Sequence, residues 1–155
     1  MIDHVVKAWW TNHRITLMLL DAVSDEGLLC TLSKRGGRNV ARQFAHIQYV
    51  RALQLQKRAK PASKGVVIFG PKDDVDRGAL REALEDSAGR IEEWLRRADA
   101  KEKGFKTFRS GVPGTLGYLV AHESHHRGSI LLTVKQCGHP VDKDVRFGIW
   151  DWNRA

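Results

Sequence analysis

The chain of 155 residues has only two cysteines, and it has no apolar run of the length that a membrane helix requires. A membrane-spanning helix needs about 20 consecutive apolar residues, and the N-terminal residues also lack the basic start and apolar stretch of a secretory signal. Two cysteines do not make a disulfide framework, so we expect a cytoplasmic protein without membrane contact. We assign Cys30 and Cys137 a structural role.

Alternating apolar residues are equally scarce, and the sequence has no internal repeat or low-complexity segment. Only residues 66–69 offer a short run with a period of two, which argues against an all-β or α/β fold. The content of hydrophobic residues is 42% and that of charged residues 28%, as is typical of a globular protein. We therefore predict a single domain over residues 1–155, long enough to bury its own core.

Four segments show apolar residues at helical spacing, and they predict an all-α protein. The predicted helices cover approximately residues 3–23, 39–60, 76–100 and 114–136. Four long helices indicate a four-helix bundle. The connection after Pro61 is longer than the roughly 2–8 residues usual between neighbouring helices, so we predict a long crossover between helices 2 and 3. Residues 141–155 contain two tryptophans and are too apolar to be a loose tail.

The fourth predicted helix contains the sequence His-Glu-Ser-His-His at residues 122–126. His122 and His126 are four residues apart and project from one face, where two imidazole nitrogens can bind the same metal ion. At about 100° per residue, the same polar strip includes Tyr118, Ser129 and Thr133. Apolar residues flank this strip, so its polar groups need partners, which a metal ion or a bound ligand would supply. Hydrogen bonding within the core is the alternative explanation.

His46 lies beside the apolar stripe of the second predicted helix. Metal sites in helix bundles are built from side chains of facing helices, so His46 is a candidate third ligand. Three neutral imidazoles with an open coordination position are typical of a catalytic rather than a structural metal site. Tyr118 and His125 are the candidate catalytic residues: Tyr118 as a hydrogen-bond donor, and His125 as a base at the edge of the strip. A surface position is the favoured interpretation for His125.

Several segments resemble one known protein family. Residues 117–132, followed by Lys-Gln-Cys-Gly-His-Pro at 135–140, resemble the last helix of the DinB/YfiT-like family. That family's signature is a His, three residues, and then His-Arg-Gly. Phe-Ala-His-Ile at 44–47 resembles the family's second-helix motif, and Gly-Ile-Trp-Asp-Trp at 148–152 resembles the C-terminus of a subgroup. The chain differs at Ser129, where the family usually has Gln.

The resemblance implies a four-helix bundle, often dimeric, in which His46, His122 and His126 bind a divalent metal ion such as nickel or zinc. It also implies a metal-dependent transferase that acts on a small-molecule substrate. Characterised relatives use low-molecular-weight thiols such as bacillithiol, mycothiol or glutathione. We therefore interpret the chain as an enzyme whose metal centre activates a thiol or water. The alternative is a non-catalytic bundle that binds an anionic ligand or nucleic acid.

The literal His-Glu-x-x-His pattern also occurs in zinc peptidases, where the glutamate is the general base. The extended form of that motif fails here, because Ser129 and Leu132 occupy the positions of its later Gly and His. Glu123 is about 100° away from His122 around the helix, so we expect it to bond at the surface or to a neighbouring helix. A metallopeptidase is therefore the less favoured function.

The formal net charge of +8 invites a comparison with nucleic-acid-binding proteins. Basic residues cluster around the second predicted helix, at Arg35, Arg38, Arg42, Arg51, Lys57, Arg58 and Lys60. However, the sequence has no helix-turn-helix, RNA-binding or zinc-finger signature, and charged runs on helices usually form a solvated face. Nucleic acid is therefore not the favoured partner, and a basic rim would equally attract an anionic thiol.

Overall fold

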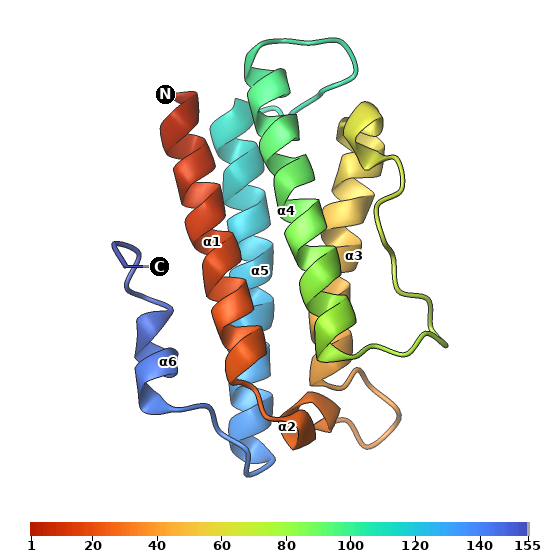
Figure 1. The fold of residues 1–155 in the computed structure, drawn as a ribbon, viewed down its shortest axis with the longest axis vertical. Helices are drawn as coiled ribbons and strands as arrows, with labels where there is room; N and C mark the ends of the chain where they lie inside the picture. Colours follow the sequence, from red (N-terminus) through yellow and green to blue (C-terminus); the bar gives the residue numbers. More distant parts are fainter. Residues whose placement is uncertain (155) are drawn as a thin grey trace.

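The structure, a computed structural model, describes residues 1–154. It has six α-helices and one short 3-10 helix, and residues 1–154 include no β-strand. Four long helices lie side by side (Figure 1): α1 (Ile2–Ala22), α3 (Val40–Arg58), α4 (Arg77–Asp99) and α5 (Gly111–Gln136). The prediction of an all-helical chain is confirmed, whereas the four-helix bundle with a long crossover stays a prediction. No helix within the described part of the chain is both long and apolar enough to cross a membrane.

Side-chain caps begin two of the long helices where the sequence predicts. The carboxamide oxygen of Asn39 accepts a hydrogen bond from the Arg42 backbone N–H at 2.9 Å, which starts α3. Asp76 caps α4 in the same way. Helix α5 begins three residues before the predicted Gly114. Pro113 lies in its first turn, where a missing backbone N–H costs no intrahelical hydrogen bond, so the proline does not delay the helix.

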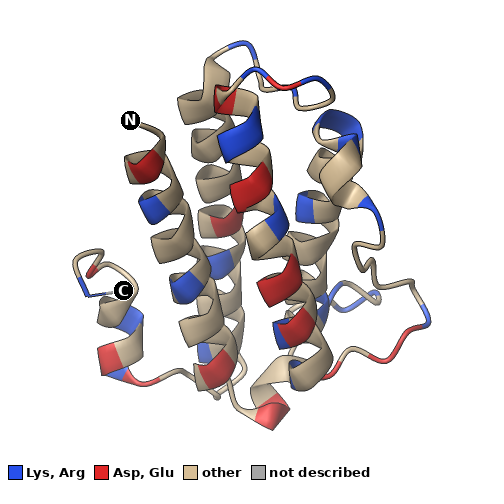
Figure 2. Ribbon diagram, turned by 45° about the horizontal axis from the view of Figure 1, so that its top comes forward, with Lys and Arg blue, Asp and Glu red and all other residues tan. Residues whose placement is uncertain are grey.

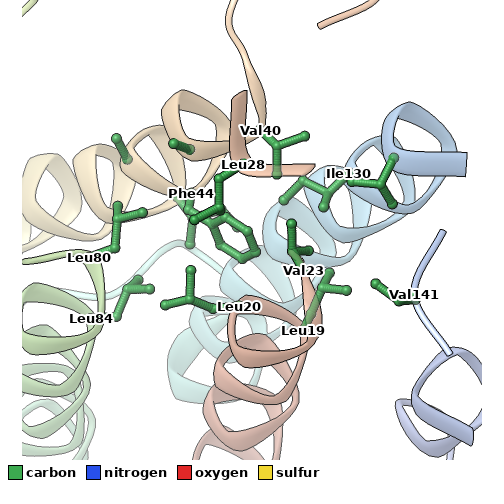
Figure 3. Close-up of a cluster of buried hydrophobic side chains, with 14 residues drawn as sticks. Leu19, Leu20, Val23, Leu28, Val40, Phe44, Leu80, Leu84, Ile130 and Val141 are labelled. Atoms are coloured by element: carbon green, nitrogen blue, oxygen red, sulfur yellow. The ribbon is translucent and has the colours of Figure 1, made fainter. Parts of the chain in front are cut away.

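Two apolar clusters form the core. Helices α1 and α3 each pack against both α4 and α5. One cluster centres on Phe44, whose ring points toward Leu20 and Val23 of the opposite segment (Figure 3). The other cluster is built around the fully buried rings of Trp9 and Trp94. Together the two clusters account for most of the apolar surface that these helices remove from water.

A layer of buried polar residues separates the two apolar clusters. Along each long helix, these residues stand between members of one cluster and members of the other. The layer consists of Asn12, His13 and Thr16 of α1, Gln48 and Arg51 of α3, Ser87 of α4, and Glu123 and Arg127 of α5. We refer to these eight residues as the polar layer. The polar layer contains charged groups in the protein interior. Whether the layer stabilises the fold therefore depends on how these charges are paired.

Short elements close the ends of the structure. Helix α2 (Asp25–Leu29) is capped by the Ser24 hydroxyl, and the 3-10 helix η1 (Lys60–Ser63) follows α3. Helix α6 (Lys143–Gly148) lies against α1 (Figure 1). The sequence predicts an ordered C-terminal segment, and Ile149 is indeed buried, but Trp150 remains 78% exposed.

Acidic and basic residues alternate along α4 (Figure 2). Four of its arginines form ion pairs with a carboxylate four residues away: Arg81 with Glu85, Arg90 with Asp86, Arg96 with Glu92, and Arg97 with Glu93. Pairs of this exposed kind contribute only about 0.3–0.5 kcal/mol each. They mark a solvated face of α4.

Candidate metal centre

Three histidines from two helices meet at one flank of the structure. His46 comes from α3, and His122 and His126 come from consecutive turns of α5; all three side chains are partly buried. Their potential ligand nitrogens all lie within 4.8 Å of one another. The ring centroid of His46 is 5.4 Å from that of His122 and 4.7 Å from that of His126. The structure thus brings together the three residues that the sequence suggests as metal ligands.

The spacing of these nitrogens fits a metal ion. Two nitrogens that each bind an ion at about 2.1 Å are at most about 4.2 Å apart, so small rotations of the rings close the remaining gap. No other group of three or more ligating side chains in residues 1–154 converges in this way. Three imidazoles leave at least one coordination position for a water or a substrate, as in catalytic zinc sites.

The three histidines are neutral at neutral pH, which leaves a nitrogen lone pair free for a metal. Burial, followed by the neighbouring His122 and His46, lowers the pKa of His126 to about 4. Burial, followed by the positive charge of Arg38, lowers the pKa of His46. Burial is also the largest cause of the lowered pKa of His122. Protons therefore do not compete with a metal for these nitrogens until the solution is acidic.

Both candidate catalytic residues lie next to the histidines. The ring of Tyr118 stacks 6.4 Å from that of His122, and its hydroxyl accepts a hydrogen bond from Gln54 at 3.4 Å. This bond leaves the Tyr118 proton available for donation to a ligand. His125 is exposed, with its ring centroid 5.1 Å from that of His126. It lies on the outer side of the site, in the surface position favoured from the sequence.

A buried acceptor without a donor lies close to the histidines. Gln43 is one helical turn before His46 and donates a hydrogen bond to the Thr133 hydroxyl at 3.5 Å. Thr133 in turn donates its proton to the Ser129 carbonyl oxygen, so reversing the Gln43 amide would not give its oxygen a donor. That carboxamide oxygen is buried and has no partner in residues 1–154. Such an atom indicates a bound water or a ligand N–H or O–H group.

A cavity opens beside His46. It has a volume of about 440 Å³ and is lined by Gly36, Gly37, Arg38, Arg42, Ala45, His46, Tyr49, Phe69 and Pro71. The guanidinium of Arg42 is held in the cavity wall, because it donates hydrogen bonds to the carbonyl oxygens of Gly70, Pro71 and Asp73. The guanidinium of Arg38 makes no hydrogen bond or ion pair within residues 1–154. Arg38 is therefore the free cation of this cavity.

Glu123, the residue between the two histidine turns, faces the polar layer and not the surface. Its side chain is 1% exposed. The guanidinium of Arg51 donates to both of its carboxylate oxygens, at 2.7 and 3.0 Å. Asn12 and Thr16 each donate to its Oε2 atom at 2.9 Å. The expectation of a bond to a neighbouring helix is correct, but the surface alternative is wrong, because the charge of Arg51 draws the carboxylate inward.

These contacts exclude Glu123 as the general base of a peptidase. Burial acts to raise the pKa of Glu123, but Arg51 and Arg127 outweigh burial and hold the pKa below its ordinary value. A carboxylate with a lowered pKa and both oxygens occupied has neither the basicity nor the access to water that a general base needs. The His-Glu-x-x-His pattern here combines two metal-ligand candidates with one structural carboxylate.

The basic cluster suggested by the sequence is not one continuous surface. Arg51 is only 1% exposed and belongs to the polar layer, which corrects its assignment to the basic face. Arg42 is bound to the cavity wall, and Arg58 donates to Gln54 and to the Thr107 carbonyl oxygen. Three of the arginines that could have contacted phosphates thus form hydrogen bonds to groups of the protein itself. This arrangement weakens the case for a nucleic-acid-binding module.

His13 lies in the polar layer and makes stability depend on pH. Burial, followed by the charge of Arg51, lowers its pKa from 6.5 to about 3. Below its unfolded pKa, the unfolded chain therefore binds a proton that the folded chain excludes, and stability falls as the pH falls. We expect this one residue to cost about 2 kcal/mol of unfolding free energy between about pH 7 and pH 5. Urea denaturation of metal-free wild type and His13→Gln at both pH values measures the difference, and equal losses in the two proteins would contradict it.

The comparison with protein families agrees with the geometry of the histidines. Residues 1–147 of the 155 match the DinB family. The chain belongs to the DinB family. The match covers all four long helices, and therefore the three histidines and the polar layer. Comparison with curated proteins and with solved structures gave no match.

DinB-family proteins typically bind a metal ion, and the histidine triad is the candidate for such a site in this member. The sequence identifies the three histidines but not the polar layer or Arg38. The sequence does contain one indication of the polar layer. Arg51 is four residues from both Ile47 and Leu55, at a core-facing position of its helix. An arginine at such a position needs a buried anion, and Glu123 supplies it. Nothing in the sequence of residues 36–38 reveals that they line a cavity.

Proposed function

We propose that this DinB-family protein is a divalent-metal-dependent thiol transferase. The observation that carries the proposal is that His46 belongs both to the histidine triad and to the wall of the cavity. A substrate in the cavity would therefore lie beside the residues that would hold a nickel or zinc ion. A divalent ion supplies positive charge there, which lowers the pKa of a coordinated thiol or water toward neutrality.

The residues of the chain bind and orient the reactants. His46, His122 and His126 would hold the ion with neutral imidazoles, which would leave its positive charge uncompensated for a bound thiol. Arg38 is placed to bind a carboxylate of the thiol, because it is the free cation of the cavity. The buried Gln43 oxygen is suited to accept an amide or hydroxyl proton. The cavity of about 440 Å³ is within the usual size of sites for small molecules.

Tyr118 is placed to assist departure of the leaving group. Its hydroxyl accepts from Gln54 and keeps its own proton free to donate. In the transfer, the thiol loses its proton to solvent and its sulfur forms a bond to an electrophilic carbon. The leaving group departs with the electron pair of the broken bond. A hydrogen bond from Tyr118 to that group would stabilise its developing negative charge.

Conjugation of a thiol with an alkyl chloride tests this function. Protein loaded with nickel or zinc is incubated with monochlorobimane and with glutathione, bacillithiol or mycothiol in turn. We expect the loaded wild type to accelerate formation of the thioether, chloride and a proton with at least one anionic thiol. In Arg38→Ala, KM for that thiol should rise about tenfold, since a hydrogen bond to a charged group contributes about 1.5 kcal/mol.

Arg35→Ala is the matched control for Arg38→Ala, because Arg35 is exposed in the same loop and does not line the cavity. Its KM should equal that of the wild type. An equal rise in both variants would mean that the charge of the loop acts only at long range. If the loaded wild type accelerates conjugation with none of the three thiols, the proposed thiol transferase function is contradicted.

A further inference from the structure

The two cysteines of the chain, remote in sequence, meet at one end of the structure. Cys30 is the C-terminal cap of α2, and Cys137 is the C-terminal cap of α5. Figure 1 shows α2 beside the C-terminal end of α5. The sulfur of Cys137 lies 3.9 Å from the carbonyl oxygen of Thr31, the residue directly after Cys30. Cys137 therefore contacts the backbone beside Cys30, and its thiol is close enough to that of Cys30 to raise the Cys30 pKa.

Core packing maintains this proximity. Leu28 of α2 and Val134 of α5 belong to the same apolar cluster, and Cys30 packs against it. At Gly27, a Cβ atom would lie at an ordinary van der Waals distance, 3.5 Å, from a methyl group of Val134, so α2 lies directly against α5 here. The thiols are therefore held together by buried side chains of α2 and α5, and not by the chance position of a loop.

The surroundings suit a redox pair better than a metal site. Both cysteines are free and partly exposed. No third metal-ligating side chain within residues 1–154 joins the two thiols. Burial, followed by the neighbouring Cys137 thiol, raises the pKa of Cys30. The Cys30 thiol therefore forms a thiolate less readily and reacts slowly at neutral pH.

We propose that Cys30 and Cys137 are a redox modification site that forms a reversible intramolecular disulfide on reaction with a low-molecular-weight disulfide. One protein thiol loses its proton and attacks the small disulfide, releasing one thiolate and leaving a mixed disulfide. The second protein thiol loses its proton, attacks the protein sulfur of the mixed disulfide and releases the other small thiolate. The small disulfide is reduced to two thiols, and the protein dithiol is oxidised to one disulfide.

The disulfide would join α2 to α5, and both helices are connected to residues of the histidine site or of the adjacent cavity. It ties α2, which leads into the segment of residues 31–39 with Arg38, to α5, which provides His122 and His126. The cross-link also closes a loop of more than 100 residues in the unfolded chain, and so disfavours unfolding. The disulfide is independent of the proposed transferase function, because neither cysteine belongs to the histidine triad or the cavity wall.

Peptide mapping after oxidation tests the proposal on the full chain. The protein is equilibrated with excess oxidised glutathione, quenched with acid, alkylated and digested with trypsin. We expect peptide 15–34 linked to peptide 136–143, with the loss of two hydrogen atoms. Dithiothreitol should restore both thiols. The melting temperature of the oxidised protein should rise by about 5–10 °C, because cross-links over long loops are the most stabilising.

The variants Cys30→Ser and Cys137→Ser provide the controls. Each should take up one glutathione, give no linked peptide and show no rise in melting temperature. Two glutathiones on the wild type, a disulfide between two molecules, or thiols that stay reduced at equilibrium would each overturn the proposal. A linked peptide without a rise in melting temperature would contradict the stabilising effect.

Discussion

Alanine in place of His126 is expected to remove tight binding of nickel and zinc while the chain stays folded. His126 is central to the triad, with ring centroids 4.6 Å from His122 and 4.7 Å from His46. Loss of a residue that merely supports a metal ligand typically weakens metal affinity about 10–100-fold, so loss of a ligand should weaken it more than about 100-fold. Calorimetric titration and metal content by mass spectrometry measure the loss. Circular dichroism reports the retained helices.

His125→Ala is the matched control for the metal experiment. His125 is the adjacent residue and is also an imidazole, but it is exposed and does not belong to the converging group. Its variant should bind metal within a few-fold of the wild type. Metal should also raise the melting temperature of the wild type and of His125→Ala but not that of His126→Ala, since only a bound ligand stabilises the folded state. Equal metal affinity in all three proteins would reject the triad as a metal site.

Replacement of Glu123 by alanine should destabilise the protein by about 3–5 kcal/mol, because it leaves buried cations without a counter-charge. Arg51 is 1% exposed and Arg127 is 5% exposed, so water cannot solvate either guanidinium in the folded state. The loss corresponds to a fall in melting temperature of roughly 10 °C for a domain of this size. Urea denaturation of metal-free protein measures the effect without a contribution from metal binding.

Two comparisons isolate the role of the Glu123 charge. Glu85→Ala removes an exposed carboxylate that also pairs with an arginine on a helix, and it should cost no more than about 0.5 kcal/mol. Arg51→Met combined with Glu123→Ala removes both partners and should be less destabilising than Glu123→Ala alone. A stability of Glu123→Ala within about 1 kcal/mol of the wild type would show that the polar layer does not depend on this carboxylate.

The local features of the structure were predictable because they depend on neighbouring residues. Apolar residues at helical spacing define the four long helices, and Asn39 marks the start of α3 within one residue. Helix periodicity also places His122 and His126 on one face. Helix α2 was not predicted, since five residues contain too little periodicity to be recognised. The C-terminal tryptophans suggested burial, but only some of that segment packs against the remaining structure.

Features that depend on contacts between distant segments were harder to predict from the sequence. Periodicity measures the angle around one helix, and it showed correctly that Glu123 points away from the histidines. It did not show that Arg51 of α3 lies opposite Glu123 and forms an ion pair with it. In the same way, the sequence presents Arg51 as one more member of a basic cluster. Burial and ion pairing depend on which helices are neighbours, and this information is not contained in any single segment.

The sequence by itself determined the helical content, the three candidate metal ligands and the likeness to the DinB family, since these rest on residue types at short, regular spacings. Only the tertiary structure decided the rest: the convergence of His46 on the α5 pair, the burial of Glu123, the free guanidinium of Arg38 and the proximity of the two cysteines. Each of these depends on how α2, α3 and α5 pack. Packing is determined jointly by all the apolar faces of the chain, so no local pattern specifies it.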